Sequence, residues 1–431
     1  MGTEISLDVG GMSISWAKNR RGPDHGDLYQ PGDLQRLRSE QINYDIADED
    51  DPGLAESEWG FARSLKSLVP RLELLGHTLS SAQHEYDRGA AAWIDERKSY
   101  QEDEKDISLD VMPFAEFLRF ISAVAIADLD DTFVSGQEDH EQREMGRFSD
   151  EGVKARLPFY PNHDAQAWSE RSYFGMLVGF LHPYTLLRLF AENDKNLTER
   201  VEWQFGPLVS NGWAQETEFV PGARRTQTYL IATEGSSDTH ILKRAFQLLR
   251  PEIADFFHFI DVSERHPFSG TGSLVKFAEG LAKIDVQNRT VFVLDNDAEG
   301  QSAFRKIKGL TFPVNMRAMV LPSLEGFESF PTAGPGGQTL SDINGRAASI
   351  ECYLDLWADG LPPPLVRWMN YKDDVGVYQG ALIDKDRYTR TFFERAGRSS
   401  YDTSRLSTVL AAIVDVCTTM AGDMRQQGAD K

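Results

Sequence analysis

The sequence predicts an α/β protein in which a parallel sheet flanked by helices is preceded by a mainly helical domain with an N-terminal β-hairpin. Three observations predict this class. Polarity alternates around Gly10-Gly11, apolar residues then recur at helical spacing, and after Gly222 short apolar runs alternate with helix candidates. The predicted domains are residues 1–222, 223–335 and 336–431.

The first domain is predicted to open with a hairpin over residues 4–16, where polar and apolar residues alternate on both sides of the Gly-Gly turn. Helices are predicted where leucines and aromatic residues recur three and four positions apart, over 65–75, 114–124 and 173–190. The charge-rich stretches 100–106 and 135–147 are expected to be solvated connections.

The second domain is predicted from strands that alternate with helices. Such alternation indicates right-handed crossover connections and a parallel sheet covered on both faces. The predicted strands are 229–232, 257–262, 291–294 and 314–321, and the predicted helices are 238–249, 274–284 and 301–307. The Gly- and Pro-rich passage 331–337 is expected to be a loop, and the last domain a helical extension that completes the site.

Composition bounds the protein class. The chain has 431 residues, of which 41% are hydrophobic, so it can bury ordinary cores in two or three domains. Cys352 and Cys417 are too few for a disulfide framework or a four-thiolate zinc site. No apolar run approaches the roughly 18 residues that span a membrane, and Met1-Gly2-Thr3-Glu4 has no basic leader. We therefore expect a cytoplasmic protein without a membrane partner.

The formal net charge of −22 argues against a chain that coats nucleic acid, because such binding needs a surplus of Lys and Arg at the contact surface. A nuclease remains compatible, since Mg²⁺ bridges acidic side chains and phosphate oxygens that would otherwise repel each other. Any nucleic-acid contact is therefore expected to be local.

Two acidic clusters follow predicted strands. Glu234 comes directly after the first strand of the second domain, and Asp295 and Asp297 come after the third. If these strands are neighbours, the three carboxylates converge at the carboxyl end of the sheet, where open α/β sheets bind ligands. Gly235 and Gly300 are expected to let the backbone turn near each cluster. Oxygen ligands of this kind suit Mg²⁺, although acidic residues also commonly cap helices.

Together the two clusters resemble the TOPRIM domain, which has a Glu-Gly after its first strand and an Asp-x-Asp after its third. The resemblance covers about residues 226–325. It implies that Glu234 acts in acid–base work or metal ligation and that Asp295 and Asp297 hold Mg²⁺ or Mn²⁺. Asp238 is similar to an additional acidic residue of nuclease-type members, with a first-turn helix acid as its alternative role. Glu299 is a further metal candidate or a helix-start carboxylate.

Two downstream residues complete the predicted site. The segment Ile343 to Leu354 resembles the one that brings another acid toward the metals in nuclease-type TOPRIM proteins, which makes Glu351 a catalytic candidate. Its alternative is a carboxylate on a helix surface. Lys385 is a candidate for stabilising charge on a scissile phosphate, or else a solvated Lys beside two Asp residues.

Other branches of the TOPRIM family fit less well. Two distant cysteines cannot build the zinc module of a primase, and no segment has the size or basic character of a topoisomerase gate. The sequence has no Gly-x-x-x-x-Gly-Lys-Ser/Thr motif of an ATPase, and Gly270-Thr271-Gly272 is too short to replace it. A compact nuclease-type protein remains.

The opening residues, Ile5 to Gly11 and Ser15 to Asn19, resemble the bacterial N-terminal domain that is found joined to HEPN or TOPRIM domains. The resemblance implies a role in defence against phage and other invading nucleic acid. Arg71 and His77 also have a spacing that HEPN ribonucleases use, although His77 after Gly76 reads more simply as a residue at a helix end.

The leading hypothesis is a Mg²⁺- or Mn²⁺-dependent endonuclease that cuts DNA or RNA and acts alone, as a homo-oligomer or with a defence partner. A non-hydrolytic TOPRIM module that binds nucleotide or nucleic acid as a sensor is the alternative, and nucleotidyl transfer on the same carboxylates is a third reading. The sequence leaves the substrate, the trigger and the oligomeric state open.

Overall fold

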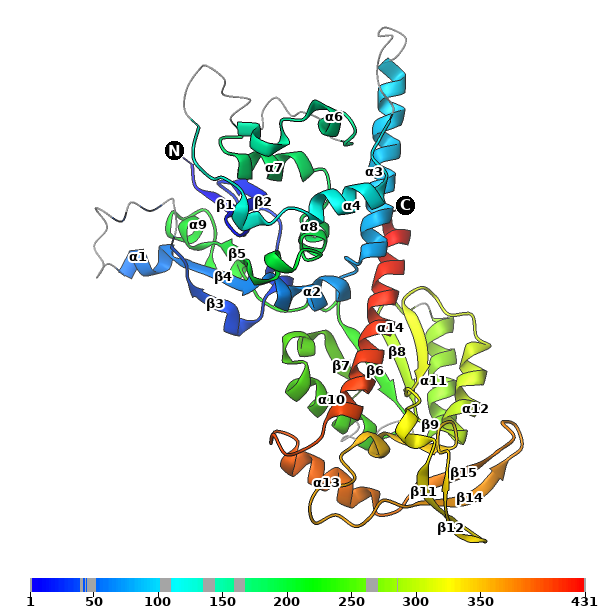
Figure 1. Cartoon of the computed structure of the whole chain (residues 1–431). Helices are drawn as coiled ribbons and strands as arrows, with labels where there is room; N and C mark the ends of the chain where they lie inside the picture. Colours follow the sequence, from blue (N-terminus) through cyan, green and yellow to red (C-terminus); the bar gives the residue numbers. More distant parts are fainter. Residues whose placement is uncertain are drawn as a thin grey trace. The chain divides into compact units, whose positions relative to one another are not determined.

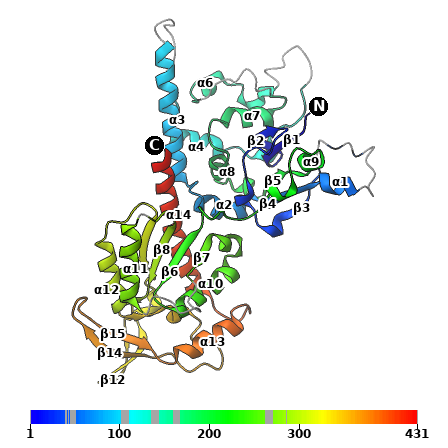
Figure 2. The same ribbon diagram turned by 180° about the vertical axis from the view of Figure 1, so that it is seen from behind.

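The computed structural model describes residues 2–38, 42, 44, 52–100, 110–134, 144–158, 167–260, 270–284 and 286–429. The chain is mixed α/β and contains both parallel and antiparallel sheets. It divides into two compact units, the first made of Met1–Ala223 with Arg425–Lys431 and the second of Arg224–Met424 (Figure 1; Figure 2 from behind). The charge-rich connections predicted near 100–106 and 135–147 fall largely outside the described residues.

The first unit contains a five-stranded antiparallel sheet in the order β2-β1-β5-β4-β3. Its strands are β1 Glu4–Val9, β2 Met12–Lys18, β3 Leu34–Arg36, β4 Trp59–Ser64 and β5 Arg200–Gln204. The predicted N-terminal hairpin is confirmed, and Gly10 and Gly11 both have positive φ in its turn. The domain was predicted to be mainly helical after this hairpin; in addition to its helices, β3, β4 and β5 extend the hairpin into a five-stranded sheet.

Helices surround this sheet. They are α1 Pro52–Ser57, α2 Leu65–Leu74, α3 Leu79–Tyr100, α4 Phe114–Ser122, α6 Glu151–Lys154, α7 Glu170–Val178, α8 Pro183–Phe190 and α9 Gly206–Ser210. The stretch predicted as one helix over 173–190 is two, because the chain turns after Val178 and Pro183 starts the next helix. One continuous core contains Leu7 of β1, Trp203 of β5 and Leu68 of α2, all essentially inaccessible to solvent.

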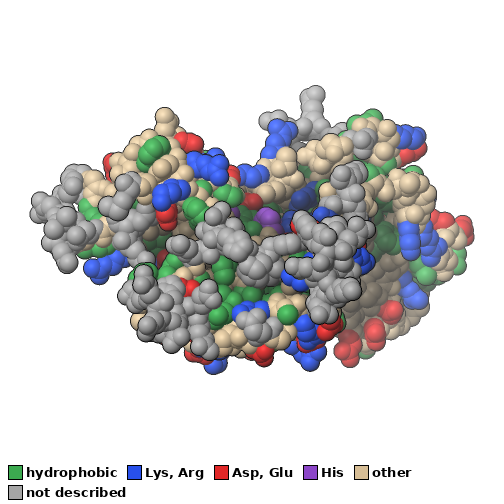
Figure 3. Space-filling view, turned by 90° about the horizontal axis from the view of Figure 1, so that it is seen from above, with side chains coloured by type: hydrophobic (Ala, Val, Ile, Leu, Met, Phe, Trp, Pro, Cys, Tyr) green, Lys and Arg blue, Asp and Glu red, His purple; other side chains and the backbone are tan. Residues whose placement is uncertain are grey.

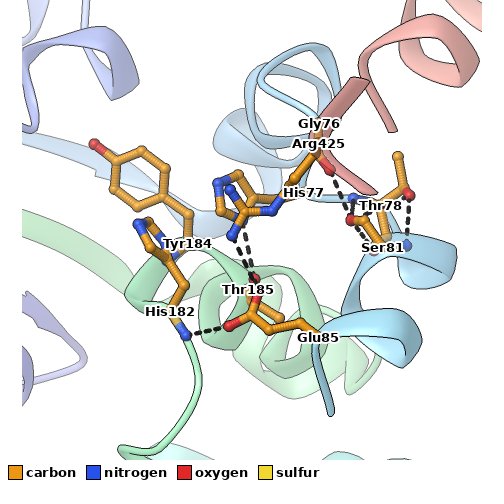
Figure 4. Close-up of polar contacts among 9 residues, drawn as sticks. All are labelled: Gly76, His77, Thr78, Ser81, Glu85, His182, Tyr184, Thr185 and Arg425. Carbon is orange, nitrogen blue, oxygen red and sulfur yellow. Dashed lines mark hydrogen bonds and ion pairs between the residues drawn. The ribbon is translucent and has the colours of Figure 1, made fainter. Parts of the chain in front are cut away.

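A buried polar relay joins three elements of the first unit (Figure 4). Glu85 of α3 accepts hydrogen bonds from the Thr185 hydroxyl (2.8 Å), the His182 main-chain N–H (2.6 Å) and Arg425 (3.0 Å). Thr185 gives its one hydrogen to Glu85, so its oxygen accepts from His77 Nδ1 at 3.0 Å. This bonding fixes the tautomer of His77 with the proton on Nδ1.

A second relay has the same order of a carboxylate, a hydroxyl group and a histidine ring. The Tyr184 hydroxyl donates to Asp27 Oδ1 at 2.7 Å and lies 3.1 Å from His25 Nδ1. Burial, followed by the nearby His182, lowers the pKa of His25 from 6.5 to about 4. The folded unit therefore holds His25 as a neutral, hydrogen-bonded ring.

The second unit is built on a four-stranded parallel sheet in the order β10-β8-β6-β7. The strands are β6 Tyr229–Thr233, β7 Phe257–Phe259, β8 Arg289–Leu294 and β10 Met316–Val320, and the connecting helices are α10 Ser236–Leu249, α11 Thr271–Lys283 and α12 Ala298–Lys308. The predicted strand–helix alternation is thus present. Helices α11 and α12 lie side by side on one face of the sheet, and α10 lies on the other (Figures 1 and 2).

The side of the sheet under α11 and α12 forms an apolar core. Phe292 of β8 and Leu274 of α11 are fully buried in it, and Ile307 of α12 is 1% exposed. This burial supplies the main stabilisation of the α/β layers, at about 25 cal/mol per Å² of apolar surface removed from water.

The C-terminal part of the second unit differs from the prediction. A second sheet, in the order β12-β11-β14-β15, occupies the region predicted as a loop and a helical extension. Its strands are β11 Phe330–Gly334, β12 Gly337–Ser341, β14 Val366–Lys372 and β15 Val377–Leu382; two further short strands, β9 Asn296–Asp297 and β13 Ala347–Ala348, pair with each other. Only α13 Lys385–Arg395 and α14 Ser404–Ala429 are α-helices in this region.

Short 3₁₀ helices connect these elements. In the first unit they are η1 Gly26–Leu28, η2 Pro31–Asp33, η3 Ile126–Asp128, η4 Gly146–Phe148, η5 Asp194–Thr198 and η6 Glu216–Glu218; in the second they are η7 Pro251–Phe256, η8 Glu325–Phe327 and η9 Ile350–Tyr353.

Helix α14 is long and apolar enough to cross a membrane by length and composition, over Ser404–Gly428, which the absence of long apolar runs did not lead us to expect. Its apolar side is nevertheless packed inside the fold, with Val409 and Ile413 fully buried and Leu410 1% exposed. Core helices of soluble proteins share this length and composition, and α14 packs as such a helix.

The His25 relay leads to a prediction for acid stability. Because its folded-state pKa is lowered, unfolded His25 takes up a proton first, and folding stability is lost as the pH falls from 6.5 through about 4. In His25→Asn the amide can still bond Tyr184 but does not titrate. The parent should therefore lose up to about 3 kcal/mol more stability than the variant over this window.

Urea unfolding at pH 7 and pH 4.5 measures this difference, followed by the fluorescence of the eight tryptophans of the chain, of which Trp203 has its ring 5.5 Å from that of His25. Parallel loss of stability in both proteins would show that His25 does not contribute to acid sensitivity.

Candidate active site

The order of the parallel strands places a ligand-binding position between β6 and β8. The chain runs from β6 outward to β7 and then returns to β8 on the other side of β6, so the connections leave these two strands in opposite directions. In open α/β sheets, the crevice beyond the carboxyl ends of such a strand pair is the usual ligand site. Thr233, the last residue of β6, pairs with Val293 of β8, so Glu234 and Asp295 emerge side by side.

Glu234 is held between two elements. Its Oε1 accepts from the Asp295 main-chain N–H (3.1 Å), and its Oε2 accepts from the hydroxyl of Thr271 at the start of α11 (2.9 Å). Asp238, in the first turn of α10, accepts from the Gly235 main-chain N–H at 3.0 Å. Asp238 therefore has the helix-start role that was its alternative interpretation, and it also faces the other acids of the site.

The loop after β8 holds two more carboxylates. Asp295 Oδ1 accepts from the Ile350 main-chain N–H at 2.9 Å. Asp297 caps α12, because its Oδ1 accepts from the Gly300 N–H at 2.7 Å, and its Oδ2 accepts from Gln379 at 2.7 Å. Each carboxylate thus has one orientation fixed by the protein.

Pairing of β9 with β13 brings Glu351 of η9 to the same place. Glu351 is 2% exposed and accepts hydrogen bonds from Ser237 (2.9 Å) and Ser349 (2.7 Å). Lys385 Nζ lies 3.5 Å from Glu351 Oε1, and this Lys is exposed over about half of its side chain (55%). The alternative interpretation, a solvated Lys beside two Asp residues, agrees with this exposure, while the contact with Glu351 places the ammonium group at the acidic cluster.

The acidic side chains act on one another's ionisation. Burial, and then the charge of Asp297, raises the pKa of Glu234 to about 7. Burial and Glu351 raise the pKa of Asp238 to about 7, and burial with all four other carboxylates raises that of Asp295 well above its ordinary range. The structure thus brings Glu234, Asp238, Asp295, Asp297 and Glu351 into one electrostatically coupled group.

Lys385 is a cation that faces this group. Glu351, together with Asp295 and Asp238, raises the pKa of its ammonium group. One lysine cannot balance five carboxylates, so at neutral pH the cluster either retains protons or attracts further positive charge. Glu299 differs from the other predicted ligands, because it is exposed and its carboxylate already pairs with Lys372 at 2.7 Å.

The site has the donor chemistry of a Mg²⁺ or Mn²⁺ centre, but it does not have a preformed ligand cage. Across the described ranges, no three His, Cys, Asp or Glu side chains form a group arranged to hold a metal ion. Mg²⁺ commonly keeps several waters and binds through only one or two carboxylates. Asp295 and Asp297, on one short loop, with Glu234 beside them, therefore fit the ion as a donor set.

The two glycines have different roles. A side chain on Gly300 would overlap the carbonyl oxygen of Asp295, so this glycine allows the start of α12 to pack against the acidic loop. Gly235 has φ −145°, an extended conformation open to any residue, and the nearest atom to an added Cβ would be 3.7 Å away. The prediction that Gly235 is needed for a turn was wrong. Ser237 donates to Glu351, and the side chain that bonds the backbone at the start of α10 is that of Asp238.

Several polar residues of the site were not predicted. Gln379 contacts Asp297, and Ser349 contacts Glu351. Asn296 is 1% exposed, and its Oδ1 accepts from the Gly345 N–H at 3.0 Å, which ties the acidic loop to the segment that precedes β13. No spacing signal points to these residues, because their partners lie far away in the sequence. For Asn296, its position between Asp295 and Asp297 is the one feature of the sequence that could have indicated a place in the site.

Arg71 and His77 do not form a site together. The Arg71 guanidinium is fully buried and donates to the main-chain carbonyls of Asp27 (2.7 Å) and Tyr29 (3.3 Å). His77 instead bonds Thr185 in the relay of Figure 4. These contacts give Arg71 a structural role and remove the basis for an Arg–His ribonuclease pair.

The surface shown in Figure 3 carries Lys and Arg side chains interspersed with Asp and Glu. The acidic composition of the whole chain predicts local rather than extended contact with nucleic acid.

The fold and the cluster define an α/β protein with an acidic site at the switch point of a parallel sheet. Comparison with known proteins places its first half: residues 1–227 match the HEPN/Toprim N-terminal domain 1. The chain therefore belongs to the HEPN/Toprim N-terminal domain family, as the opening residues predicted. No curated protein and no solved structure matches the chain.

The contrast between the two glycines gives a testable expectation. Gly300→Ala should displace the acidic loop and cost on the order of 2 kcal/mol, because its methyl group meets backbone that cannot rotate away. Gly235→Ala should change stability by less than about 0.5 kcal/mol. Chemical denaturation of both variants checks this. Equal stabilities would mean that the loop adapts to a side chain at Gly300.

The raised carboxyl pKa values predict how metal-free protein responds to pH. Between the ordinary value of 3.8 and the raised value of about 7, folded Asp238 keeps a proton that the unfolded chain releases, so stability falls as the pH rises through this window. Asp238→Asn keeps an oxygen for the Gly235 N–H but removes the charge. It should be more stable than the parent by up to about 4 kcal/mol at pH 8 and about equally stable at pH 4.

Unfolding in EDTA at the two pH values measures this effect, with Asp386→Asn, an exposed position on α13, as the matched control. A gain that is the same at pH 4 and pH 8 would show that ionisation of Asp238 is not its cause.

Proposed function

We propose that the second unit is a TOPRIM-type catalytic unit that hydrolyses phosphodiester bonds of DNA or RNA with Mg²⁺ or Mn²⁺. The observation that carries the proposal is the gathering of Glu234, Asp295 and Asp297 at the ends of two neighbouring parallel strands, with Glu351 and Lys385 beside them. The order Glu-Gly, then Asp-x-Asp, on the first and third strands supports the TOPRIM assignment.

Asp295 and Asp297 would hold the metal, with Glu234 close enough to share in ligation or to act on water. When bound, the ion would neutralise phosphate charge and lower the pKa of a coordinated water. The acidic residues alone would repel a phosphate, so the cation is also what makes the cluster compatible with this substrate.

The residues of the chain have complementary roles in this proposal. A pKa of about 7 lets Glu234 accept a proton from water near neutral pH and release it again. Lys385 is partly exposed and positively charged, so it can contact a phosphate oxygen while Glu351 holds its position. Ser237 and Ser349 keep Glu351 in place through their hydroxyls.

The alternative is a TOPRIM module that binds nucleotide or nucleic acid without cutting it. One observation favours it: Glu234, Asp297 and Glu351 each accept hydrogen bonds from protein donors through both oxygens, and no ligand cage is preformed in the described residues. Metal-dependent binding without turnover would identify this function.

We also propose that the protein acts in bacterial defence against invading nucleic acid, in the cytoplasm. Membership of the HEPN/Toprim N-terminal domain family supports this role. The net charge of −22 favours activation by assembly into a homo-oligomer or with a partner that contributes positive surface.

The nuclease proposal predicts that replacing one carboxylate of the site by an amide strongly reduces cleavage. Asp295→Asn and Asp297→Asn should each reduce cleavage by about 100-fold or more, because metal binding loses a charged ligand, while the fold is kept. Asp386→Asn should cleave like the parent. EDTA should abolish cleavage, and Mn²⁺ should restore it in the parent and in Asp386→Asn but not in Asp295→Asn or Asp297→Asn.

The assay uses a panel of single- and double-stranded DNA and RNA with Mg²⁺ or Mn²⁺, and circular dichroism confirms folding. Cleavage by Asp295→Asn at the parent rate, or no cleavage of any substrate by the parent, would contradict the proposed function.

A further inference from the structure

Gln379 of β15 is a buried amide that contacts the acidic loop of the site; it is 6% exposed. Its Nε2 donates to Asp297 Oδ2 at 2.7 Å, and its Oε1 accepts from the Glu299 main-chain N–H at 3.1 Å. A single side chain thus binds both the carboxylate and the backbone of the same loop, one with a donor and one with an acceptor.

Asp297 depends on this contact for the direction of its second oxygen. Gly300 N–H fixes Oδ1 by capping α12, and Gln379 fixes Oδ2. Without Gln379, the carboxylate could rotate about its last bond while Oδ1 or Oδ2 still capped the helix. Each oxygen that accepts one hydrogen bond retains a second lone pair, so both stay available to a cation in a defined orientation.

The β14–β15 hairpin, whose second strand carries Gln379, is fastened to α12 through β14 and the turn. Lys372 of β14 pairs with Glu299 at 2.7 Å, Arg305 donates to the Asp374 carbonyl at 2.8 Å, and Ser302 bonds the Asp374 carboxylate. Since α12 begins at the acidic loop, these contacts hold the β14–β15 hairpin in fixed register with Asp297.

We infer that Gln379 is a positioning residue that orients Asp297 for metal binding, so that the C-terminal sheet forms part of the metal site. This inference rests on the proposed function for the identity of the ligand. It assigns to Gln379 the part played by outer residues that hydrogen-bond a metal-ligating carboxylate, whose loss typically costs 10–100-fold in metal affinity or activity.

Gln379→Met tests the inference, because methionine has the length of glutamine but no strong hydrogen-bonding group. Gln338→Met is the matched control, since Gln338 lies exposed on β12 of the same sheet. Mn²⁺ binding is measured directly by electron paramagnetic resonance, and cleavage is measured as a function of Mn²⁺ concentration. Thermal unfolding shows whether each variant is folded.

We expect Gln379→Met to bind Mn²⁺ at least about 10-fold more weakly than the parent and Gln338→Met to match the parent. Saturating Mn²⁺ should restore most of the cleavage, which a damaged fold would not allow. If Gln379→Met does not fold, Gln379→Asn, which keeps the amide but is one methylene shorter, replaces it with the same expectation.

Equal Mn²⁺ affinity in Gln379→Met and the parent, or a loss that Gln338→Met shares, would overturn the inference and leave the proposed function intact. A parent that binds Mn²⁺ but cuts no nucleic acid would remove the nuclease proposal, and the affinities would still decide the role of Gln379. A parent that does not bind Mn²⁺ would overturn both.

Discussion

Parallel pairing of β6 with β8 is the constraint on which the candidate site depends. Because Thr233 lies opposite Val293, the first residues beyond both strands emerge at one point, and these residues are acidic. Neither strand carries the site alone. The apolar core between the sheet and α11 and α12 keeps the two strands together, so the stability of this core determines whether the carboxylates meet.

Bringing five carboxylates together opposes folding, since each loses water and faces like charge. The structure offsets part of this cost with hydrogen bonds from Thr271, from the Ile350 and Gly300 N–H groups, and from Gln379. Burial, and then the neighbouring negative charges, still raises the pKa values of Glu234, Asp238 and Asp295. Such a cluster is typical of functional sites, where a bound cation or substrate completes the charge balance.

The sequence allowed the parallel sheet and its acidic ends to be predicted because both depend on local order. An apolar run, a polar residue and then a helix pattern appear in each βα unit, and adjacent parallel strands end at a common edge. Glu351 was found through family resemblance, and Lys385 through the charge that a scissile phosphate requires. The position of Glu351 depends on pairing between β9 and β13, which are two residues each and too short to show any periodicity.

The missed elements depend on distant partners. Strand β5 pairs with β1 and β4 from far along the chain, and the hairpin of β14 and β15 lies in a region with few apolar alternations. Gln379 carries no signal at all, because a buried amide becomes recognisable only when its partners are known. Gly235 shows the opposite error, since a conspicuous glycine proved to have an ordinary backbone conformation.

The Arg425–Glu85 ion pair bears on how this protein can be divided. The family match ends at residue 227, yet the first compact unit also includes residues 425–431. A fragment cut at the end of the match would leave Glu85 facing Thr185 and the His182 N–H without its guanidinium partner. Sequence borders and structural borders therefore differ here, and the N-terminal unit is complete only when the last helix of the chain is present.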